Sequence, residues 1–378
     1  MKIIPTFEYN SATIICCIFL LMGIIQLVYV LFIHGKLCLY KNKKDFTSKS
    51  LPPVSIIISA RNESDNLFEN LPQILEQDYP KFEVIVVNHQ SIDDSYTILN
   101  AYSQQYPNLR VIELEKSQHL KPGKKLPLTI GIKGAKYEHL LFTDADCKPA
   151  SRKWLKSMSS EFIEPKKIVL GYGPYIKRKG LLNKIIRFDT AWIAMNYFSM
   201  ALAKLPYMGV GRNLGYTKST FNSVSGFKSH YSISSGDDDL FIQECATKDN
   251  LSINLEPSSF CYSEACSSWP EWYIQKTRHF TTSVRYNVFK KGLLGIYPLS
   301  LLILMITFVS LLFNEDFRWF SLIGFSSVVV IKWVVQGICF NKLLEKSFIS
   351  MLPIYDLLYA LILPILFYTT DKNEIKKW

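Results

Sequence analysis

The sequence contains no Cys-x-x-Cys pair, although it has eight cysteines in 378 residues. Cys16, Cys17 and Cys339 lie inside apolar runs, where we expect reduced thiols that serve as packing residues. This pattern argues against a disulfide framework and against a zinc site. The sequence also has no nucleic-acid recognition motif and no tract rich in basic and aromatic residues, so we expect no nucleic-acid partner despite the net charge of +11.

What the sequence has in excess is apolar residues, which make up 48% of the chain and gather at its two ends. Basic residues outnumber acidic ones by 43 to 32, and many lysines lie close to the apolar segments. Such a charge suits a face that lies against anionic lipid and a site that binds an anionic substrate. A chain of this length can form one large or two modest domains, each with a core.

The first apolar segment, residues 11–33, matches the ~20 residues that cross a bilayer core, and Gln26 is its only strongly polar residue. It is too long for a signal peptide, and no small-residue cleavage site follows it. Several lysines follow instead, so the positive-inside rule places the next domain in the cytoplasm. We expect residues 1–50 to be an anchor and basic linker in the cell inner membrane. The lysines are Lys36, Lys41, Lys43, Lys44 and Lys49.

The composition turns apolar again beyond Gly292, and we expect residues 293–378 to form C-terminal transmembrane helices. Residues 293–313 and 317–340 are long enough to span a bilayer, whereas 351–368 is shorter and contains two prolines. Three spans would place the lysine-rich tail outside, against the positive-inside bias, and a re-entrant last segment would keep it inside. The sequence leaves both alternatives open.

Lys332 lies late in the second of these C-terminal runs, where a charged side chain is costly. It either snorkels to the cytoplasmic interface or lines an internal polar path. Snorkelling is favoured, because the basic residues Lys342 and Lys346 follow on the same side.

Residues 51–268, between the apolar ends, have the pattern of alternating strands and helices. Apolar and β-branched runs bounded by turn residues predict the strands. Strands that alternate with helices indicate parallel β-α-β units and a doubly wound sheet. The predicted strands are 54–60, 82–87, 109–114 and 139–143, and the predicted helices include 66–77, 124–136 and 240–248.

Asp144 and Asp146 follow the last of these strands directly, one residue apart. Ligands of open α/β sheets bind beyond the carboxyl ends of the strands, so we expect both carboxylates to face a crevice. Paired carboxylate oxygens suit Mg²⁺ or Mn²⁺, which tolerate nearby phosphate. Because Asp is also common in turns, the motif taken alone has a second explanation as a simple strand end.

Several motifs, in order along residues 51–290, resemble the nucleotide-sugar half of family-2 glycosyltransferases, which are inverting enzymes with a GT-A fold. Each motif is weak alone, but their order makes a strong signal. The N-terminal motifs are VSIIISARNE, LEQDYPKFEVIVV, KPGKKLPLTIGI and LLFTDADCKP. The C-terminal motifs are GVGRN from residue 209, SGDDDL from residue 235 and QKTR from residue 275. The last is similar to the family's Gln-x-x-Arg-Trp element, with His279 in place of the tryptophan.

The resemblance implies an α/β GT-A fold with a Rossmann-like nucleotide-sugar-binding sheet, a nucleotide-diphosphate sugar donor and a divalent cation, Mg²⁺ or Mn²⁺. The metal ligands that it implies are Asp146 and Asp144. The chain departs from the family at the end of the second strand, which reads Asn88-His89-Gln90-Ser91 in place of Asp-Asp-x-Ser. The donor-binding residues that the resemblance implies are Ala60, Asn62, Glu63, Asn88, Lys124, Asp144, Arg212, Gln275 and Arg278.

Three of the basic residues in these motifs have more than one explanation. Lys124 can be one of several solvated lysines, with Lys125 among them. Arg278 can be an interfacial residue, since the aromatic residues around it predict that residues 269–292 form an amphipathic segment at the membrane surface. We expect His89 to contact its loop or the edge of the nucleotide base rather than to act as a catalytic base.

Inversion at the anomeric carbon needs a base that takes the proton of the attacking hydroxyl. The resemblance points to the acidic run Asp237, Asp238 and Asp239, and Asp238 is favoured. Asp237 is then the acid that caps the following helix, and Asp239 is a solvated helix residue. Three adjacent acids repel one another, which is more than a helix cap requires.

We therefore expect a membrane-bound hexosyltransferase of family 2. It moves a sugar with inversion from a nucleotide-diphosphate donor to a lipid, lipid-linked sugar or glycan acceptor. A processive polysaccharide synthase is the alternative within this class, although the small number of helices and His279 argue against it. An inactive membrane scaffold that binds nucleotide sugar is the alternative from a different class, and release of nucleoside diphosphate distinguishes it from an enzyme.

Overall fold

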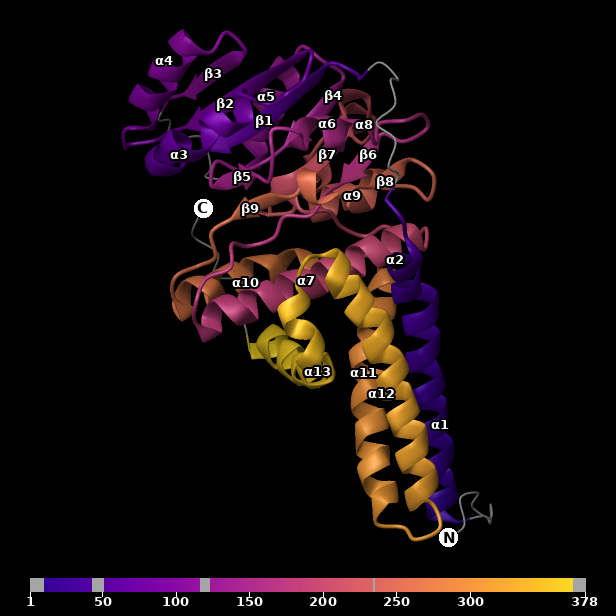
Figure 1. Ribbon diagram of the computed structural model, residues 1–378. Coiled ribbons are helices and arrows are strands. Elements are labelled where there is room, and N and C mark those ends of the chain that lie inside the picture. The colour runs from indigo at the N-terminus through magenta and orange to yellow at the C-terminus, as the bar shows by residue number, and fades with distance from the viewer. Residues whose placement is uncertain (1–9, 43–50, 116–122, 234, 370–378) are drawn as a thin grey trace. The chain divides into compact units, whose positions relative to one another are not determined.

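The computed structural model describes residues 10–42, 51–115, 123–233 and 235–369, which divide into two compact units. The sheet unit lies between Lys41 and Tyr286. The helical unit comprises the described residues up to Tyr40 and those from Asn287 onward. Figure 1 labels the elements of both units.

A seven-stranded sheet forms the centre of the sheet unit, in the order β3-β2-β1-β4-β7-β6-β8. The first four strands are parallel, as predicted. The sheet is nevertheless mixed, because β7 runs antiparallel to both of its neighbours. The strands are β1 (Val54–Ala60), β2 (Phe82–His89), β3 (Leu109–Leu114), β4 (His139–Phe142), β6 (Ile168–Leu170), β7 (Leu214–Thr217) and β8 (Leu251–Ile253).

A second, two-stranded antiparallel sheet follows the end of β4 in the chain. It consists of β5 (Cys147–Pro149) and β9 (Cys261–Ser263). The helices of the sheet unit are α3 (Ser64–Leu75), α4 (Ser95–Gln105), α5 (Lys125–Gly134), α6 (Trp154–Ser159), α7 (Leu181–Leu202), α8 (Lys218–Ser223), α9 (Asp239–Cys245) and α10 (Trp269–Ser283), with short 3₁₀ turns at Gly211–Asn213, Lys228–His230 and Pro257–Ser259.

Both faces of β1 are covered by protein, which explains its unbroken apolar sequence. Ile56 and Ile58 belong to the hydrophobic core that includes the buried leucines of α3. Ile57 points to the other face, where α5 approaches so closely that a Cβ on Gly131 would lie 2.7 Å from the Ile57 side chain. The alternation along one strand therefore fixes a helix on each side of the sheet.

The segment 269–292 is not a single amphipathic helix, because α10 ends at Ser283 and the next helix begins at Val288. Within α10 the Trp272 side chain is buried and Trp269 is exposed, so the helix has one face of each kind. A buried ion pair of 2.5 Å joins Lys276 of α10 to Asp189 of α7. The sequence pattern did not predict α7, whose apolar residues have no clear helical period.

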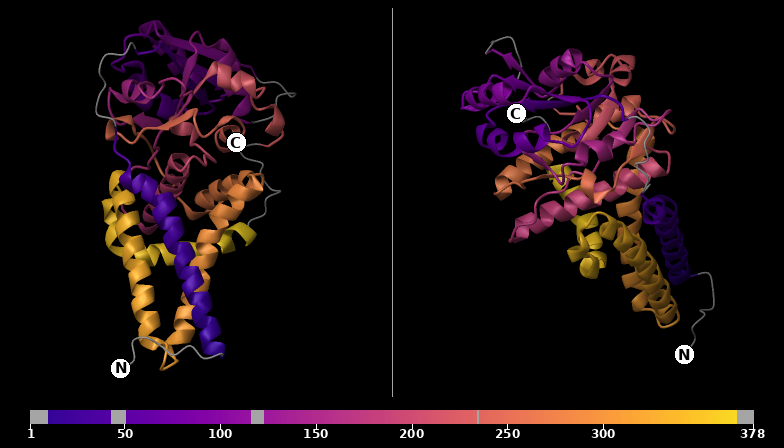
Figure 2. Two further views of the ribbon diagram at one scale, coloured as in Figure 1. Left: turned by 90° about the vertical axis from the view of Figure 1, so that its right-hand side faces the viewer. Right: turned by 45° about the horizontal axis from the view of Figure 1, so that its top comes forward.

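The helical unit contains the long apolar segments, and four of them are long and apolar enough to cross a membrane. Ser11–Leu39 is one continuous stretch, in which a π-helical turn at Val30–His34 separates α1 (Ser11–Tyr29) from α2 (Gly35–Leu39). The others are α11 (Val288–Leu312), α12 (Arg318–Lys342) and Lys346–Thr369, in which a 3₁₀ turn precedes α13 (Leu352–Thr369). Figures 1 and 2 show α1, α11 and α12 side by side as a bundle.

The prediction that Lys332 snorkels to an interface is wrong. Its side chain is only 5% exposed and forms an ion pair of 2.9 Å with Asp356 of α13, itself 4% exposed. The competing interpretation, an internal polar environment, is the one that the structure supports. The sequence missed the pairing because Asp356 lies in a different predicted segment.

Asn213 is a polar centre that connects separate parts of the sheet unit. Its Oδ1 accepts a hydrogen bond of 3.0 Å from the Trp154 indole, and its Nδ2 donates at 2.8 Å to the carbonyls of Tyr172 and Ser259. The side chain is fully buried. The absence of a side chain at Gly171 makes room for Asn213, since a Cβ at position 171 would lie 2.5 Å from the Asn213 amide.

Asn213→Ala should lower the free energy of unfolding by about 3 kcal/mol, because three buried partners each lose a bond worth about 1 kcal/mol. Thermal or denaturant unfolding of the purified protein measures this loss. Asn222→Ala, at an exposed position, is the matched control and should change stability by less than about 0.5 kcal/mol. A neutral Asn213→Ala variant would show that these bonds are not what connects the unit.

Candidate active site

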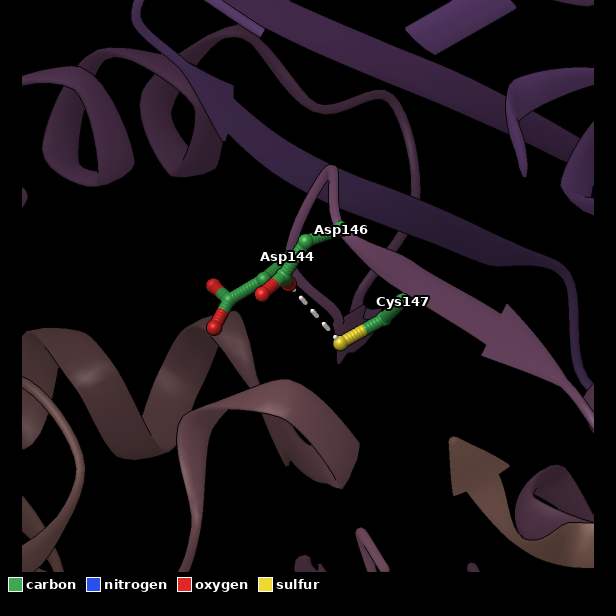
Figure 3. Close-up of side chains that lie close together, drawn as sticks. All are labelled: Asp144, Asp146 and Cys147. Carbon is green, nitrogen blue, oxygen red and sulfur yellow. Dashed lines mark hydrogen bonds between the residues drawn. The ribbon is translucent and has the colours of Figure 1, made fainter. Parts of the chain in front are cut away.

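The carboxylates of Asp144 and Asp146 lie on the turn between β4 and β5, and both are partly exposed. Cys147 opens β5 and is buried. The possible ligand atoms of the three residues lie within 4.8 Å of one another. Figure 3 shows the Cys147 thiol directed at Asp146, whose Oδ1 accepts its hydrogen bond at 3.2 Å. The turn thus presents two acids at the carboxyl edge of the sheet, as the strand pattern predicted.

Lys124, the residue before α5, is bound to the first of these acids. Its ammonium lies 2.6 Å from Oδ1 of Asp144, so the explanation of Lys124 as a solvated lysine is wrong. Burial lowers the pKa of Lys124, but the charges of Asp144, Asp237 and Asp146 outweigh this effect and raise it above its ordinary value. Lys124 is therefore charged and borders both acidic groups.

The two carboxylates of the turn have opposite electrostatic environments. Burial would raise the pKa of Asp144, but Lys124, with Arg212 and Arg278 further away, lowers it below its ordinary value. Burial and the neighbouring Asp144 raise the pKa of Asp146. One of two adjacent carboxylates therefore resists ionisation. Such a pair is suited to bind a divalent cation, because the positive charge would relieve the repulsion between the two carboxylates.

Cys147 is not suited to serve as a third ligand. Burial raises the pKa of its thiol well above the usual value, and the neighbouring Cys261 and Asp146 add to the effect. Mg²⁺ and Mn²⁺ also prefer oxygen ligands, whereas sulfur suits softer metals. The fitting donor set for Mg²⁺ or Mn²⁺ is therefore the carboxylate oxygens of Asp144 and Asp146 alone, with room for oxygen ligands from a substrate.

Arg212 and the residues of α10 bring positive charge to the same site. The Arg212 guanidinium donates from Nε and Nη2 to the Gly173 carbonyl at 2.8 and 2.5 Å and lies 4.6 Å from the centre of the Tyr175 ring. The Tyr175 hydroxyl accepts a bond of 3.1 Å from Gln275. Arg278, one turn further along α10, is close enough to lower the pKa of Asp144. The structure thus brings all three predicted residues together.

The turn after β1 carries the next group of predicted donor residues. Ala60 ends β1 and pairs in register with Asn88 of β2. Asn62 has a left-handed backbone, with φ of 55°, and its side chain accepts a bond of 2.8 Å from the amide of Ile92. Burial raises the pKa of Glu63, and Asp146 and Asp144 act in the same direction. The acid of this turn therefore lies near the other two.

The side-chain amide of Asn88 forms hydrogen bonds within the protein. Its Nδ2 donates to Glu113 of β3 at 2.9 Å, its Oδ1 accepts from Ser91 at 2.5 Å, and only 2% of the residue is exposed. His89 is fully buried within β2. Its burial argues against a contact with the edge of a base, and a contact with its loop stays a prediction. A strand that continues through His89 turns this side chain into the protein interior.

The three acids of the run at 237–239 have different surroundings. Asp238 is the N-cap of α9, and its carboxylate accepts from the amides of Gly211 at 2.9 Å and Asp239 at 2.7 Å. The prediction that Asp237 caps the helix is therefore wrong. Asp237 is partly exposed and has no hydrogen-bond partner among the residues that the structure describes.

The prediction that Asp239 is a solvated helix residue is also wrong. It is 6% exposed, and its Oδ2 accepts from the hydroxyls of Thr282 at 2.5 Å and Tyr286 at 2.7 Å. Burial raises its pKa. Asp239 thus connects the end of α10 to the start of α9. This structural role explains why one of the three adjacent acids is present.

The interpretation of Lys125 as a solvated lysine is wrong as well, because its side chain is buried. Its ammonium donates to the carbonyls of His230 at 2.5 Å and Ile233 at 2.9 Å. Burial lowers the pKa of Lys125 to about 8, although Asp237, Asp239 and Asp238 act against it. The residue therefore connects α5 to the segment that leads to the acids.

Sequence reasoning missed three residues of this site: Glu113, Tyr175 and Lys125. A charged residue at the carboxyl end of a predicted strand is a signal that could have pointed to Glu113. Tyr175 lies outside any strand or helix and had no such signal. Lys125 was hidden among neighbouring lysines, because a run of like charges is typical of a solvated face.

Comparison with known protein families agrees with this arrangement. The family described as "Glycosyl transferase family 2" matches residues 55–215, and the one described as "Glycosyl transferase family group 2" matches residues 152–369, which is more than half of the chain. The chain belongs to the family-2 glycosyltransferases, and it is a glycosyltransferase with a GT-A fold.

Individual relatives are similar over limited stretches. Glycosyltransferase AglE of Haloferax volcanii is 33% identical over 111 residues, which cover 29% of this chain and 35% of the relative. Poly(ribitol-phosphate) beta-glucosyltransferase of Bacillus spizizenii is 38% identical over 95 residues, which cover 25% of this chain and 14% of the relative. The matched segments thus span only a minor part of either relative.

A solved structure is similar over most of the chain. It is the mannosyltransferase PcManGT from Pyrobaculum calidifontis in complex with GDP-Man and Mn²⁺. Its TM-score is 0.53 at 17% identity, and the match covers 88% of this chain and 99% of that one. At this identity the likeness establishes the fold.

The electrostatics of the acids predict a pH-dependent stability. Burial, with Asp237 and Asp239, raises the pKa of Asp238 from 3.8 to about 7. The folded protein therefore binds a proton here more tightly than the unfolded chain, and this contribution to stability is lost as pH rises through 7. Asp238→Asn does not titrate, so its melting temperature relative to wild type should increase from pH 5 to pH 8.

Melting curves of the purified wild type and Asp238→Asn at the two pH values measure this difference. The surface variant Asn222→Ala controls for the general effect of pH. A difference between wild type and Asp238→Asn that is the same at pH 5 and pH 8 would contradict the raised pKa.

Proposed function

We propose that the chain is a membrane-anchored inverting glycosyltransferase that takes a nucleotide-diphosphate sugar from the cytoplasm. One observation carries this proposal. Lys124 is bound to Asp144 after the end of β4, and Asp238 accepts from the Gly211 amide before the start of β7, so the metal-binding acids and the acidic run lie at the same edge of the sheet. A donor held at the first group would present its anomeric carbon to the second.

On the donor side, the carboxylates of Asp144 and Asp146 would hold Mg²⁺ or Mn²⁺ together with the diphosphate. A divalent cation supplies charge that stabilises the leaving nucleoside diphosphate. Lys124, Arg212 and Arg278 surround these acids with positive charge and would orient the phosphates. The Mn²⁺ in the structurally similar mannosyltransferase supports the choice of cation.

On the acceptor side, Asp237 is our choice for the base. The argument for Asp238 depended on Asp237 being the helix cap, and it is Asp238 that occupies the N-cap. With Asp239 bound to Thr282 and Tyr286, Asp237 is the acid left to face the acceptor. It would take the proton of the acceptor hydroxyl as that oxygen bonds to the anomeric carbon and the bond to the diphosphate breaks.

The acceptor we propose is a lipid-linked sugar or a glycan. The four apolar helices would hold the site at a bilayer, where such acceptors occur. The Bacillus spizizenii relative is named for transfer to poly(ribitol-phosphate), which supports a polymeric acceptor. Ala60, Asn62, Glu63 and Asn88 would border the nucleotide.

A donor panel with the purified protein tests the function. UDP-sugars and GDP-sugars are incubated with Mn²⁺ and detergent-solubilised membrane lipid, and release of nucleoside diphosphate is measured. We expect one donor class to be used, and chelator to abolish release. Asp144→Asn and Asp146→Asn should each reduce the rate sharply, because each removes charge from the cation site.

Lys148→Met, which changes an exposed residue of the same segment, is the matched control and should retain the rate. Full activity of the wild type in chelator would contradict the proposal that a divalent cation is needed for transfer. No release with any donor, from protein that melts cooperatively, would favour the scaffold that only binds nucleotide sugar. The length of the product separates single transfer from polymerisation.

Asp237→Asn should lower the rate of transfer by roughly two to four orders of magnitude, the usual contribution of a general base. Donor binding and melting temperature should be retained, because Asp237 makes no structural bond among the described residues. Asp238→Asn should cost less in rate, since its amide keeps one acceptor oxygen near Gly211. Steady-state kinetics and melting curves of both variants decide between the two acids.

The opposite ranking, with Asp238→Asn inactive and folded while Asp237→Asn is active, would assign the base to Asp238. Asp239→Asn serves as the structural control. It should lower the melting temperature, because Asp239 is buried against Thr282 and Tyr286.

A further inference from the structure

The helical unit contains a connected group of polar side chains between apolar helices. The ammonium of Lys332 in α12 lies 2.9 Å from the Asp356 carboxylate of α13 and donates at 2.6 Å to Oε1 of Gln26 in α1. The Tyr297 hydroxyl of α11 donates to the same carboxylate at 2.8 Å. One charged pair thus ties four helices together.

Further bonds complete this polar group. The Gln26 amide donates to the Tyr297 carbonyl at 2.7 Å and to the Ser300 hydroxyl at 2.8 Å. The Gln336 amide donates at 2.7 Å to the Tyr297 hydroxyl. Lys332 also lies 4.8 Å from the centre of the Tyr297 ring. All six side chains of the group, Asp356 included, are buried, so neighbouring polar groups rather than water stabilise the charged pair.

A buried ion pair is weak evidence for stability, because desolvation offsets most of its attraction. It does, however, penalise every arrangement in which one partner is left alone in an apolar medium. Asp356 is the only charged residue of α13. Its pairing with Lys332 therefore specifies where α13 lies against the bundle.

The direction of α13 differs from that of the other three long helices. Figure 1 and the left view of Figure 2 show α13 running across the bundle, whereas α1, α11 and α12 run along it. Most of α13 is unburied, and its exposed side chains before Tyr368 are apolar. They include Ile354, Leu358, Leu361, Ile362 and Ile365.

We propose that the Lys332–Asp356 pair holds α13 in the plane of one leaflet, with lipid acyl chains against its exposed apolar face. The helix would then not cross the bilayer, although it is long and apolar enough to do so. Lipid is the chosen occupant because α1, α11 and α12 expose the same kind of apolar surface next to it. These three helices are also long and apolar enough to cross a bilayer core.

The proposal decides between the two topologies that the sequence leaves open. The Lys342 ammonium at the end of α12 donates to the Tyr40 carbonyl just beyond α2, so both ends lie at the end of the bundle from which the chain continues into the sheet unit. An in-plane α13 keeps Tyr368 on that same side. A crossing α13 would carry Tyr368 to the other side.

Depth measurement tests the orientation directly. A fluorophore is attached to Leu358→Cys or Ile365→Cys in a cysteine-free full-length background, and nitroxide lipids labelled at shallow or deep positions quench it in vesicles. An in-plane helix gives the same depth at both positions. A crossing helix places them about 10 Å apart, since seven residues advance by about that distance. A fluorophore that neither lipid quenches would show a protein partner on this face and overturn the proposal.

Labelling with an impermeant maleimide gives an independent answer. Tyr368→Cys should react from the same side of sealed vesicles as Gln104→Cys in the sheet unit. It should react from the side opposite to Glu315→Cys, between α11 and α12. Both reference positions are exposed. Reaction of Tyr368→Cys from the side of Glu315→Cys would overturn the proposal. The outcome does not depend on whether the enzyme uses the proposed donor.

The ion pair is tested by removing its partners separately and together. Lys332→Leu and Asp356→Leu should each lower the melting temperature, because a buried charge loses its partner, and the double variant should recover most of the loss. Asp356→Leu should also separate the depths at 358 and 365. Asp316→Leu, at an exposed position in the α11–α12 connection, is the control. Single variants with unchanged melting and depth would overturn the role of the pair.

Discussion

The sheet unit depends on how the negative charge around its crevice is balanced. Five carboxylates gather there from three separate stretches of sequence, and Lys124 forms an ion pair with one of them, Asp144. Burial, and then repulsion from the neighbouring acids, raises the pKa of Asp146 above its ordinary value and that of Asp238 to about 7. A site short of positive charge attracts a divalent cation, at some cost in stability before it binds. The five acids are Glu63, Asp144, Asp146, Asp237 and Asp238.

The sheet brings these charges together because the carboxyl ends of its parallel strands meet at one edge. The turn after β1 carries Glu63 and the turn after β4 carries Asp144, and the two strands are paired in register. The antiparallel strand β7 enters from the opposite direction. Its start, not its end, therefore lies at the same edge, and the turn before it places the Gly211 amide on Asp238. The mixed sheet thus adds the acidic run to a site that parallel strands alone would leave incomplete.

The sequence predicted the parts of this fold that are encoded locally. β1 and β3 have the predicted bounds, and the Asp pair at the end of β4 and the apolar segments at both ends are present. It did not predict α7 or β7, because LGYT is too short to show a period and α7 is buried on most sides. The motifs found the acids at 237–239, but not their roles. Which of three adjacent acids caps a helix depends on the Gly211 amide, and which is buried depends on Tyr286.

Lys125 and Lys332 were misjudged for the same physical reason. Each has other lysines nearby in sequence, and such a pattern is typical of solvated side chains. In the structure each donates a hydrogen bond to an acceptor that lies far away in the sequence. Lys125 donates to a carbonyl 105 residues further along the chain, and Lys332 to an amide oxygen 306 residues before it. A buried lysine that loses its partners is costly, so arrangements of the chain that separate them are disfavoured. Lys125 therefore restricts where the acidic run can lie, and Lys332 restricts where α13 can lie. In both units a buried positive charge determines how distant segments are arranged, which local sequence patterns do not record.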